Sequence, residues 1–155
     1  MCISHEPDIY PCGKRVLFVG HEASRTGAPI LLLHLLRWLK QNSGMQFEIL
    51  LREGGALEGD FAALAPTTVL KVSPVEEVLC KVCKRLGWKM PARFTLAGKA
   101  VNYARGRKID LVYANTVVVA EEAEALASLA LPLVWHIHEM PCDPQLRWRT
   151  AVSKC

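Results

Sequence analysis

The sequence has neither a membrane-spanning apolar run nor a legible export signal. Its longest apolar run, residues 28–36, is interrupted by His34, whereas a transmembrane helix needs about 20 such residues. Residues 1–7 contain no cationic leader and no apolar core segment. These absences predict a protein of the cytoplasm, which is a reducing compartment.

Cysteine spacing gives little support for disulfides or for structural zinc. The six cysteines are scattered along the chain, and a reducing location disfavours a disulfide framework. Cys80 and Cys83 form a CxxC pair, but no second pair and no His pair at finger spacing completes a four-ligand site. On a helix the two cysteines adjoin an apolar stripe, so we expect buried core thiols. The stripe consists of Val78, Leu79, Val82 and Leu86.

Basic residues are in mild excess, with 19 Lys and Arg against 15 Asp and Glu, a net charge of +4. The excess lies after residue 80, in two amphipathic stretches separated at residues 90–91. A solvated surface, an anionic lipid surface and a phosphorylated ligand are the alternatives for these stretches. Trp88 and Phe94 are isolated and no recognition motif is present, so nucleic-acid binding is not predicted.

Strand and helix patterns alternate along the chain, and its length of 155 residues is typical of a single domain. Residues 16–19 form a continuous apolar run typical of a strand buried on both faces. Alternating strands and helices predict an α/β, Rossmann-like fold with helices on both faces of a parallel sheet, in the order 3-2-1-4-5. The predicted strands are residues 16–19, 46–51, 67–72, 109–114 and 132–138, and the predicted helices are residues 29–40, 56–64, 75–86, 93–107 and 118–129.

Polar residues follow three of these strands. In such a sheet ligands bind beyond the carboxyl ends of the strands, at the switch between the first and fourth. We therefore expect a functional crevice at this edge. The residues delivered there are His21, Glu22, Ser24, Arg25 and Thr26 after the first strand, Asn115 and Thr116 after the fourth, and His138 and Glu139 after the fifth.

Gly27 precedes a helix whose free backbone N–H groups would face this crevice and suit a phosphate. Residues 20–27 match neither the GxGxxG fingerprint nor the Walker pattern, which argues against hydride transfer and nucleotide hydrolysis.

His136 and His138 are two residues apart and point to the same face of a strand. With Glu139, Cys142 or Asp143 they would make a metal site, the basis of a metal-dependent hydrolase. A histidine beside a carboxylate at a strand end also suits a general base or a ligand-orienting group. The second alternative is favoured, so no metal is expected.

Residues 16–29, followed by a leucine-rich helix, resemble the opening of bacterial family 4 retaining glycosyltransferases, which have the two-domain GT-B fold. Residues 112–116 and 134–139 look like two later segments of the same N-terminal domain. The match spans about residues 14–141 in the correct order. In that family the N-terminal domain mainly holds the acceptor, and the sugar nucleotide sits mostly on the C-terminal domain.

The resemblance implies a role for individual residues. Thr26, Gly27 and Ala28 fall in the loop that closes over the donor phosphates. His138 corresponds to a histidine near the transferred sugar and is the expected catalytic residue. The strand-end crevice, by contrast, supplies the expected substrate-binding residues, which are His21, Ser24, Asn115, Thr116 and Glu139.

The sequence also departs from the family, whose members are more than twice as long and carry a paired-glutamate motif in a second domain that this chain lacks. We expect residues 1–141 to be the acceptor-side domain and residues 142–155 the truncated start of the interdomain region. The expected activity is hexosyl transfer from a nucleoside diphosphate sugar to a glycan or lipid-linked acceptor, with no cofactor. It requires a C-terminal donor domain or a partner subunit, so the isolated chain should be inactive.

Three alternatives stay open beside this reading: a non-catalytic module that binds carbohydrate or nucleotide, a module that docks a partner chain, and a subunit of a split transferase. Peripheral contact with the inner face of a membrane and self-association also stay open.

Overall fold

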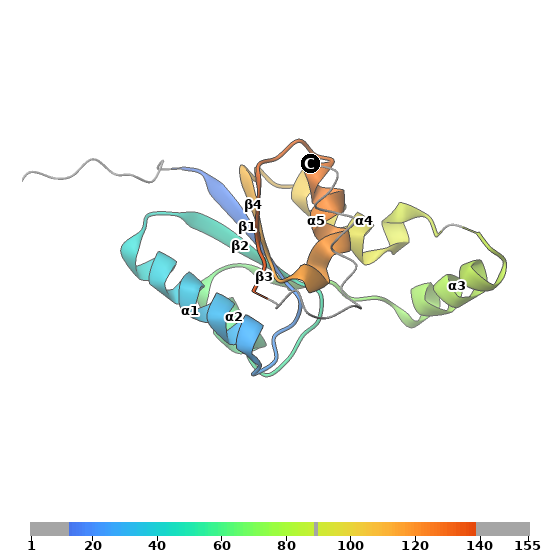
Figure 1. Ribbon diagram of the computed structural model, residues 1–155, viewed down its shortest axis with the longest axis horizontal. Coiled ribbons are helices and arrows are strands. Elements are labelled where there is room, and N and C mark those ends of the chain that lie inside the picture. Colours follow the sequence, from blue (N-terminus) through green and yellow to red (C-terminus); the bar gives the residue numbers. More distant parts are fainter. Residues whose placement is uncertain (1–12, 89, 139–155) are drawn as a thin grey trace, which may run out of the picture.

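A computed structural model describes residues 13–88 and 90–138, which fold around a five-stranded parallel sheet (Figure 1). The strand order is β3-β2-β1-β4-β5, which confirms the predicted α/β, Rossmann-like fold and its strand order. The strands are β1 (Arg15–Gly20), β2 (Gln46–Leu51), β3 (Thr67–Val69), β4 (Leu111–Asn115) and β5 (Leu133–His136).

Helices cover both faces of the sheet (Figure 1). On one face lie α1 (Gly27–Asn42) and α2 (Glu58–Leu64), and on the other α4 (Leu96–Arg105) and α5 (Ala120–Ala127). Two short 3-10 helices, η1 (Ala92–Phe94) and η2 (Val117–Val119), precede α4 and α5. The remaining helix, α3 (Pro74–Arg85), extends away from the sheet (Figure 1).

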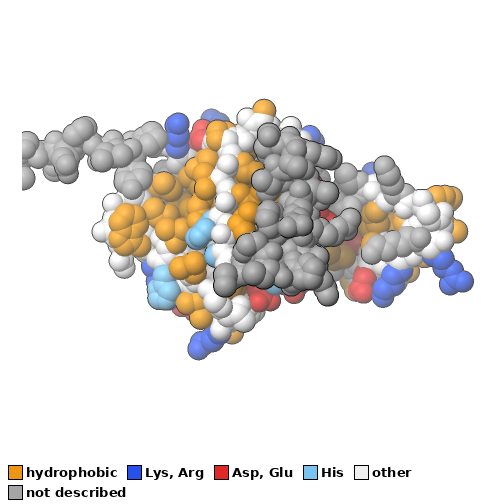
Figure 2. All heavy atoms as spheres, viewed as in Figure 1, with side chains coloured by type: hydrophobic (Ala, Val, Ile, Leu, Met, Phe, Trp, Pro, Cys, Tyr) orange, Lys and Arg blue, Asp and Glu red, His pale blue; other side chains and the backbone are white. Residues whose placement is uncertain are grey.

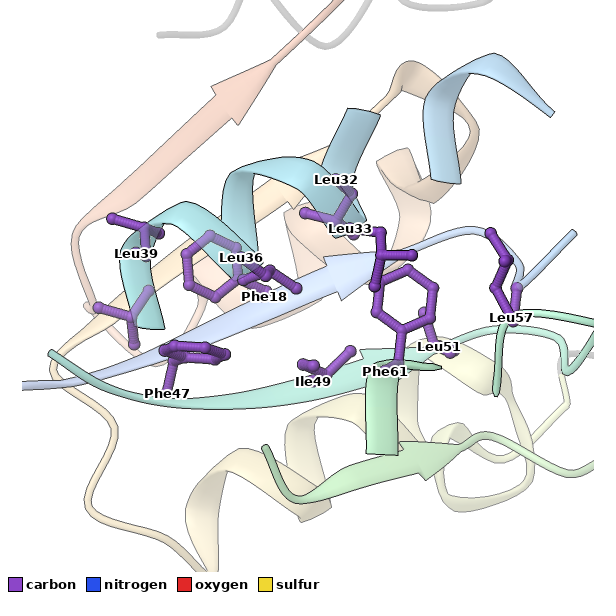
Figure 3. Close-up of a cluster of buried hydrophobic side chains, with 12 residues drawn as sticks. Phe18, Leu32, Leu33, Leu36, Leu39, Phe47, Ile49, Leu51, Leu57 and Phe61 are labelled. Atoms are coloured by element: carbon purple, nitrogen blue, oxygen red, sulfur yellow. The ribbon is translucent and has the colours of Figure 1, made fainter. Parts of the chain in front are cut away.

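The central strand β1 shows why its sequence is apolar without alternation. Phe18 points to the face covered by α1 and α2, where it packs in a cluster with Leu36 and Phe61 (Figure 3). Leu17 and Val19 belong to the cluster on the opposite face, with α4 and α5. Because helices bury both faces of the sheet, apolar residues are favoured at every buried position of this strand.

Several predicted boundaries are wrong, mostly at helix ends. The predicted helix over residues 93–107 is divided, because Thr95 caps α4 by accepting a hydrogen bond from the Gly98 amide at 3.0 Å. The predicted helix over residues 118–129 begins as 3-10 turn η2. Strand β3 ends at Val69, short of the predicted residue 72, and β5 ends at His136, so His138 follows this strand and does not lie within it.

The CxxC segment lies on α3, and only part of its predicted burial is confirmed. Cys83 is buried and Cys80 half-buried, both as free thiols. Val78, Val82 and Leu86, by contrast, are 60%, 47% and 54% exposed, so most of the apolar stripe beside the thiols does not pack in the core. The reason is that α3 extends away from the sheet and turns the stripe outward.

Candidate functional site

The loop after β1 holds a compact hydrogen-bonded group at the carboxyl end of the sheet. The Glu22 carboxylate accepts hydrogen bonds from the hydroxyls of Ser24 and, at 3.4 Å, of Thr26. The two hydroxyls lie 2.8 Å apart. The Ser24 hydrogen bond lowers the pKa of Glu22, and His21 Nδ1 lies 4.0 Å from the same carboxylate. Glu22 is therefore ionised at neutral pH and organises the predicted loop residues around itself.

Helix α1 begins directly after this loop. Thr26 occupies the N-cap position, but its side chain makes no capping hydrogen bond, because it turns back toward Glu22. The first N–H groups of a helix have no partner within the helix, and the first turn of α1 contains no acidic residue. A methyl group added at Gly27 would meet no atom within 4 Å. The backbone at Gly27 thus leaves room for close approach, beside the Glu22 carboxylate that Thr26 contacts.

Asn115 and Thr116, at the end of β4, are each 2% exposed and are used to fix the backbone. The Asn115 amide donates to the Ala28 carbonyl at 3.3 Å, which ties β4 to the start of α1. Thr116 has a φ of 81°, which is rare for a β-branched residue. Its conformation is held by Thr116 N–H donating to the His136 carbonyl at 2.8 Å and by Trp135 Nε1 donating to the Thr116 carbonyl at 2.9 Å.

The two predicted histidines differ in their partners. His136 Nδ1 lies 2.7 Å from the hydroxyl of Tyr113, whose pKa is raised by burial. The His138 ring packs edge-on against that of His136, with centroids 4.9 Å apart. Both ring nitrogens of His138 are buried, and neither has a hydrogen-bond partner in the part of the chain that the structure describes. Both ring nitrogens of His138 therefore have unused hydrogen-bonding capacity, whereas His136 Nδ1 is engaged by Tyr113.

Sequence reasoning missed two residues at this edge, Arg52 and Glu122. Arg52 follows β2, and its Nη1 donates to the Val118 carbonyl at 3.2 Å, while its buried Nε has no partner within the described ranges. Glu122, in the first turn of α5, is 1% exposed, and neither carboxylate oxygen has a partner among the described residues. Burial raises the pKa of Glu122, and the residue's own backbone N–H, together with the attraction of Arg52 and His21, opposes this only in part.

Only one of these two residues had a sequence signal. Arg52 directly follows an apolar strand, so the strand-end rule applied to the first, fourth and fifth strands would have found it. Glu122 stands in a helix that also contains Glu121 and Glu124, and no pattern separates it from them.

The unpartnered polar atoms are concentrated at one edge of the sheet. Within residues 13–88 and 90–138, every buried side-chain nitrogen or oxygen without a hydrogen-bond partner belongs to Arg52, Glu122 or His138. These residues follow β2, β4 and β5, so they lie beyond the carboxyl ends of parallel strands. Each such atom costs about 1–3 kcal/mol when nothing pairs with it. Buried polar atoms without partners are uncommon in folded proteins, so this edge is the candidate site.

The described residues include no group of three or more His, Cys, Asp and Glu side chains placed to hold a metal ion. Glu139, Cys142 and Asp143 lie outside the described residues. The same described ranges contain no helix that is both long and apolar enough to cross a membrane.

Comparison with solved structures finds a similar protein that was crystallised with ligands. The chain is similar to Anabaena HepE, whose crystal structure was determined in complex with UDP and glucose. The two share 25% sequence identity with a TM-score of 0.59, over 89% of this chain and 34% of HepE. The chain thus spans about a third of the HepE length.

Other comparisons add little. The C-terminal domain of a hydrogenase from Pyrococcus furiosus matches in two crystal structures, with 15% and 13% identity and TM-scores of 0.48 and 0.49, and covers 82% and 83% of this chain. The chain spans 95% and 96% of those two structures, but a likeness this weak carries no argument. No protein-family model and no curated protein matches the sequence.

Proposed function

We propose that the chain is the acceptor-side domain of a glycosyltransferase that moves a hexose from a nucleoside diphosphate sugar to a glycan or lipid-linked acceptor. UDP and glucose, the molecules bound in the HepE structure, are the two parts of such a donor. The observation that carries the proposal is the gathering of unpartnered polar atoms from Arg52, Glu122 and His138 at the edge where this fold binds ligands.

The N-terminus of α1 is the proposed contact for the donor diphosphate. Its free N–H groups and the helix dipole stabilise negative charge, and Gly27 leaves room for close approach. In the transfer step the same groups stabilise the leaving diphosphate, so a metal ion is not required. Thr26 and Ala28 complete this loop in the proposal.

His138 is the proposed group that orients the transferred sugar. Its two buried and unpartnered ring nitrogens provide one donor and one acceptor in the neutral form. Two sugar hydroxyls can fill these roles, one accepting from the N–H and one donating to the other nitrogen, which fits a residue that holds the sugar at the reaction centre. His21, Ser24, Asn115, Thr116 and Glu139 surround this position in the proposal, with Asn115 and Thr116 acting through the backbone they fix.

The complete reaction requires a second domain, which the proposal takes to carry most of the nucleotide site. This chain matches 34% of HepE, and we assign residues 1–141 to the acceptor-side domain and residues 142–155 to the start of the interdomain region. We also propose that the transfer follows a retaining mechanism, as in family 4 enzymes. The proposed location is the cytoplasm, at the inner face of a membrane.

The test is an NMR titration of the 155-residue chain with UDP and with UDP-glucose. We expect binding weaker than micromolar, with backbone shifts at Gly27, Ala28 and His138 and none at Gly44, which lies beyond the opposite end of α1. Sub-micromolar affinity would contradict the assignment of most nucleotide contacts to another domain. Shifts confined to other regions would contradict the proposed site.

A matched pair of glycine variants separates binding from folding. A methyl group at Gly27 or at Gly44 meets no atom within 4 Å, so Gly27→Ala and Gly44→Ala should both fold normally. Gly27→Ala should weaken UDP binding by about an order of magnitude, because the methyl group blocks close approach of a phosphate to the backbone. Equal affinities of the two variants would remove the phosphate loop from the proposal. A separate assay of transfer activity, after a donor domain is added, distinguishes a transferase from a module that only binds.

A further inference from the structure

A row of five aromatic rings crosses the sheet from its buried core to its carboxyl edge. Phe47 on β2 packs edge-on against Phe18 on β1, with ring centroids 5.6 Å apart (Figure 3). Phe18 packs in turn against Tyr113 on β4, at 4.9 Å. Tyr113 meets His136 on β5 edge-on at 6.0 Å, and His136 meets His138 edge-on at 4.9 Å. All four distances are typical of packed aromatic pairs, so these residues form one continuous set of contacts, which we call the aromatic row.

The two ends of the aromatic row are held in different ways. Phe18 and Phe47 are 2% and 8% exposed and belong to the cluster covered by α1 and α2. His138 lies beyond the last residue of β5, and neither of its ring nitrogens has a hydrogen-bond partner among the described residues. Figure 2 shows His side chains among hydrophobic ones on the visible face of the molecule. Within the described part of the chain, packing against the His136 ring is therefore what orients His138.

The His136 ring is fixed by the hydroxyl of Tyr113, which lies 2.7 Å from His136 Nδ1. Burial raises the pKa of Tyr113, so the phenol keeps its proton at neutral pH. The described residues offer that proton no other acceptor, so the phenol donates it to Nδ1. A neutral imidazole has one accepting and one protonated nitrogen, and the bond made by one determines the state of the other. The bond from Tyr113 therefore places the His136 proton on Nε2 and holds the ring in one orientation.

We infer that Tyr113 is a positioning residue that, through the His136 ring, holds His138 in the orientation needed to bind the transferred sugar. The hydrogen bond fixes the His136 ring, and the edge-on contact then fixes the plane of the His138 ring. A side chain that is already oriented loses less conformational entropy when its ligand binds, which increases affinity. The sugar-binding role of His138 belongs to the proposed function, on which this part of the inference rests. The orientation of the ring does not depend on it.

The test is NMR of the histidine ring nitrogens and carbons in the 155-residue chain, in the parent and in Tyr113→Phe. The parent should show His136 with its proton on Nε2 and a sharp set of His138 ring signals. Tyr113→Phe should show a mixture of His136 tautomers, and the His138 ring signals should shift and broaden. Unchanged His138 signals in this variant, or a His136 proton on Nδ1 in the parent, would overturn the inference.

Tyr103→Phe is the matched control. Tyr103 is also half-buried, and its hydroxyl donates to Glu48 at 2.8 Å, but it packs with the cluster on the opposite face of the sheet. Each variant removes one hydroxyl group and one hydrogen bond, so the two should unfold at similar temperatures. Tyr103→Phe should leave the ring signals of both histidines as in the parent. The same broadening of His138 in both variants would mean a general loss of structure and would overturn the inference.

A second variant tests whether the His136 ring transmits the effect. His136→Leu keeps an apolar side chain on β5 but removes both the acceptor of the Tyr113 bond and the ring that packs against His138. The His138 ring signals should broaden in this variant at least as much as in Tyr113→Phe. A His138 ring as ordered as that of the parent would show that another group orients it and would overturn the inference.

Titrations with UDP-glucose and with UDP separate the sugar contact from the rest of the ligand. Tyr113→Phe should weaken UDP-glucose binding by about threefold or more, because His138 must be ordered when the sugar binds, and should leave UDP affinity unchanged. Tyr103→Phe should change neither affinity. Equal UDP-glucose affinities of the parent and Tyr113→Phe would overturn the positioning role. If the parent bound no UDP-glucose, the proposed function would fail, and the His138 ring signals would still decide whether Tyr113 orients that ring.

Discussion

Replacing Glu122 by glutamine should raise the free energy of unfolding at pH values where the buried carboxylate is ionised. Glu122 is 1% exposed, and neither carboxylate oxygen has a hydrogen-bond partner in residues 13–88 and 90–138. An unsatisfied buried polar group costs about 1–3 kcal/mol, and more when it is charged. Glutamine keeps the size and removes the charge, so we expect a gain of about 1–2 kcal/mol. For a chain of this length that gain corresponds to a rise in Tm of about 2–8 °C.

The gain should depend on pH in a defined direction. Burial raises the pKa of Glu122 in the folded chain, so the folded state binds its proton more tightly than the unfolded state does. The parent protein therefore loses stability as pH rises from the ordinary glutamate pKa through the raised one. The glutamine variant has no such proton. Its advantage should be small near pH 4, which is about the ordinary pKa of a glutamate, and largest above the raised pKa.

Urea unfolding of both proteins across this pH range measures the effect, with Glu121→Gln as the matched control. Glu121 is the exposed neighbour of Glu122 on α5, and its substitution should change stability by no more than about 0.5 kcal/mol. A loss of stability in Glu122→Gln, with Glu121→Gln unchanged, would mean that the folded chain already holds the carboxylate favourably. That result would refute the interpretation of Glu122 as an unsatisfied group.

The remaining predictions concern two histidines and one ion pair. In a protein completed with a donor domain, His138→Ala should lower turnover about 10² to 10⁴-fold with little change in Tm, measured by a transfer assay and thermal unfolding. His136→Ala should instead lower stability by about 1–2 kcal/mol in urea unfolding, because it leaves a half-buried phenol without its partner. Glu48→Gln should lower stability by about 1–3 kcal/mol in the same assay, because the carboxylate accepts from Tyr103 and Arg107, each at 2.8 Å.

The sheet was predictable because most of its strands are short, mainly apolar runs between polar loops. β1 and β2 are buried along nearly their whole length, and burial of that kind leaves a signal in every residue. The helix ends were less predictable, since they depend on local hydrogen bonds. Thr95 ends one helical segment and caps the next by accepting from Gly98, and periodicity alone does not reveal that interruption.

Helix α3 shows a different limit of sequence reasoning. The periodicity correctly predicted a helix and identified its apolar side. It did not reveal what covers that side, and Val78 and Val82 are exposed as a result. An amphipathic pattern specifies that one face avoids water, whereas the partner of that face depends on how the rest of the chain packs.

The position of the candidate site was predictable to the same extent as the sheet. Topology alone brings the ends of β1, β4 and β5 to one edge, which is why His21, Asn115 and His138 were candidates before the structure was known. Topology does not say which polar side chains find partners there. Asn115 proves to be engaged with Ala28, whereas Glu122, with no distinguishing pattern, proves to be buried and unpaired.

The unsatisfied groups of the described residues fall in two separate places and are of opposite kinds. At the carboxyl edge of the sheet, polar atoms of Arg52, Glu122 and His138 are buried without partners. On α3, apolar side chains are exposed without cover. Both features lower the stability of a domain considered alone, so they are retained where function compensates for them. A polar ligand would satisfy only the buried polar atoms at the sheet edge, and an apolar surface would cover only the exposed side chains on α3. One partner therefore does not account for both features.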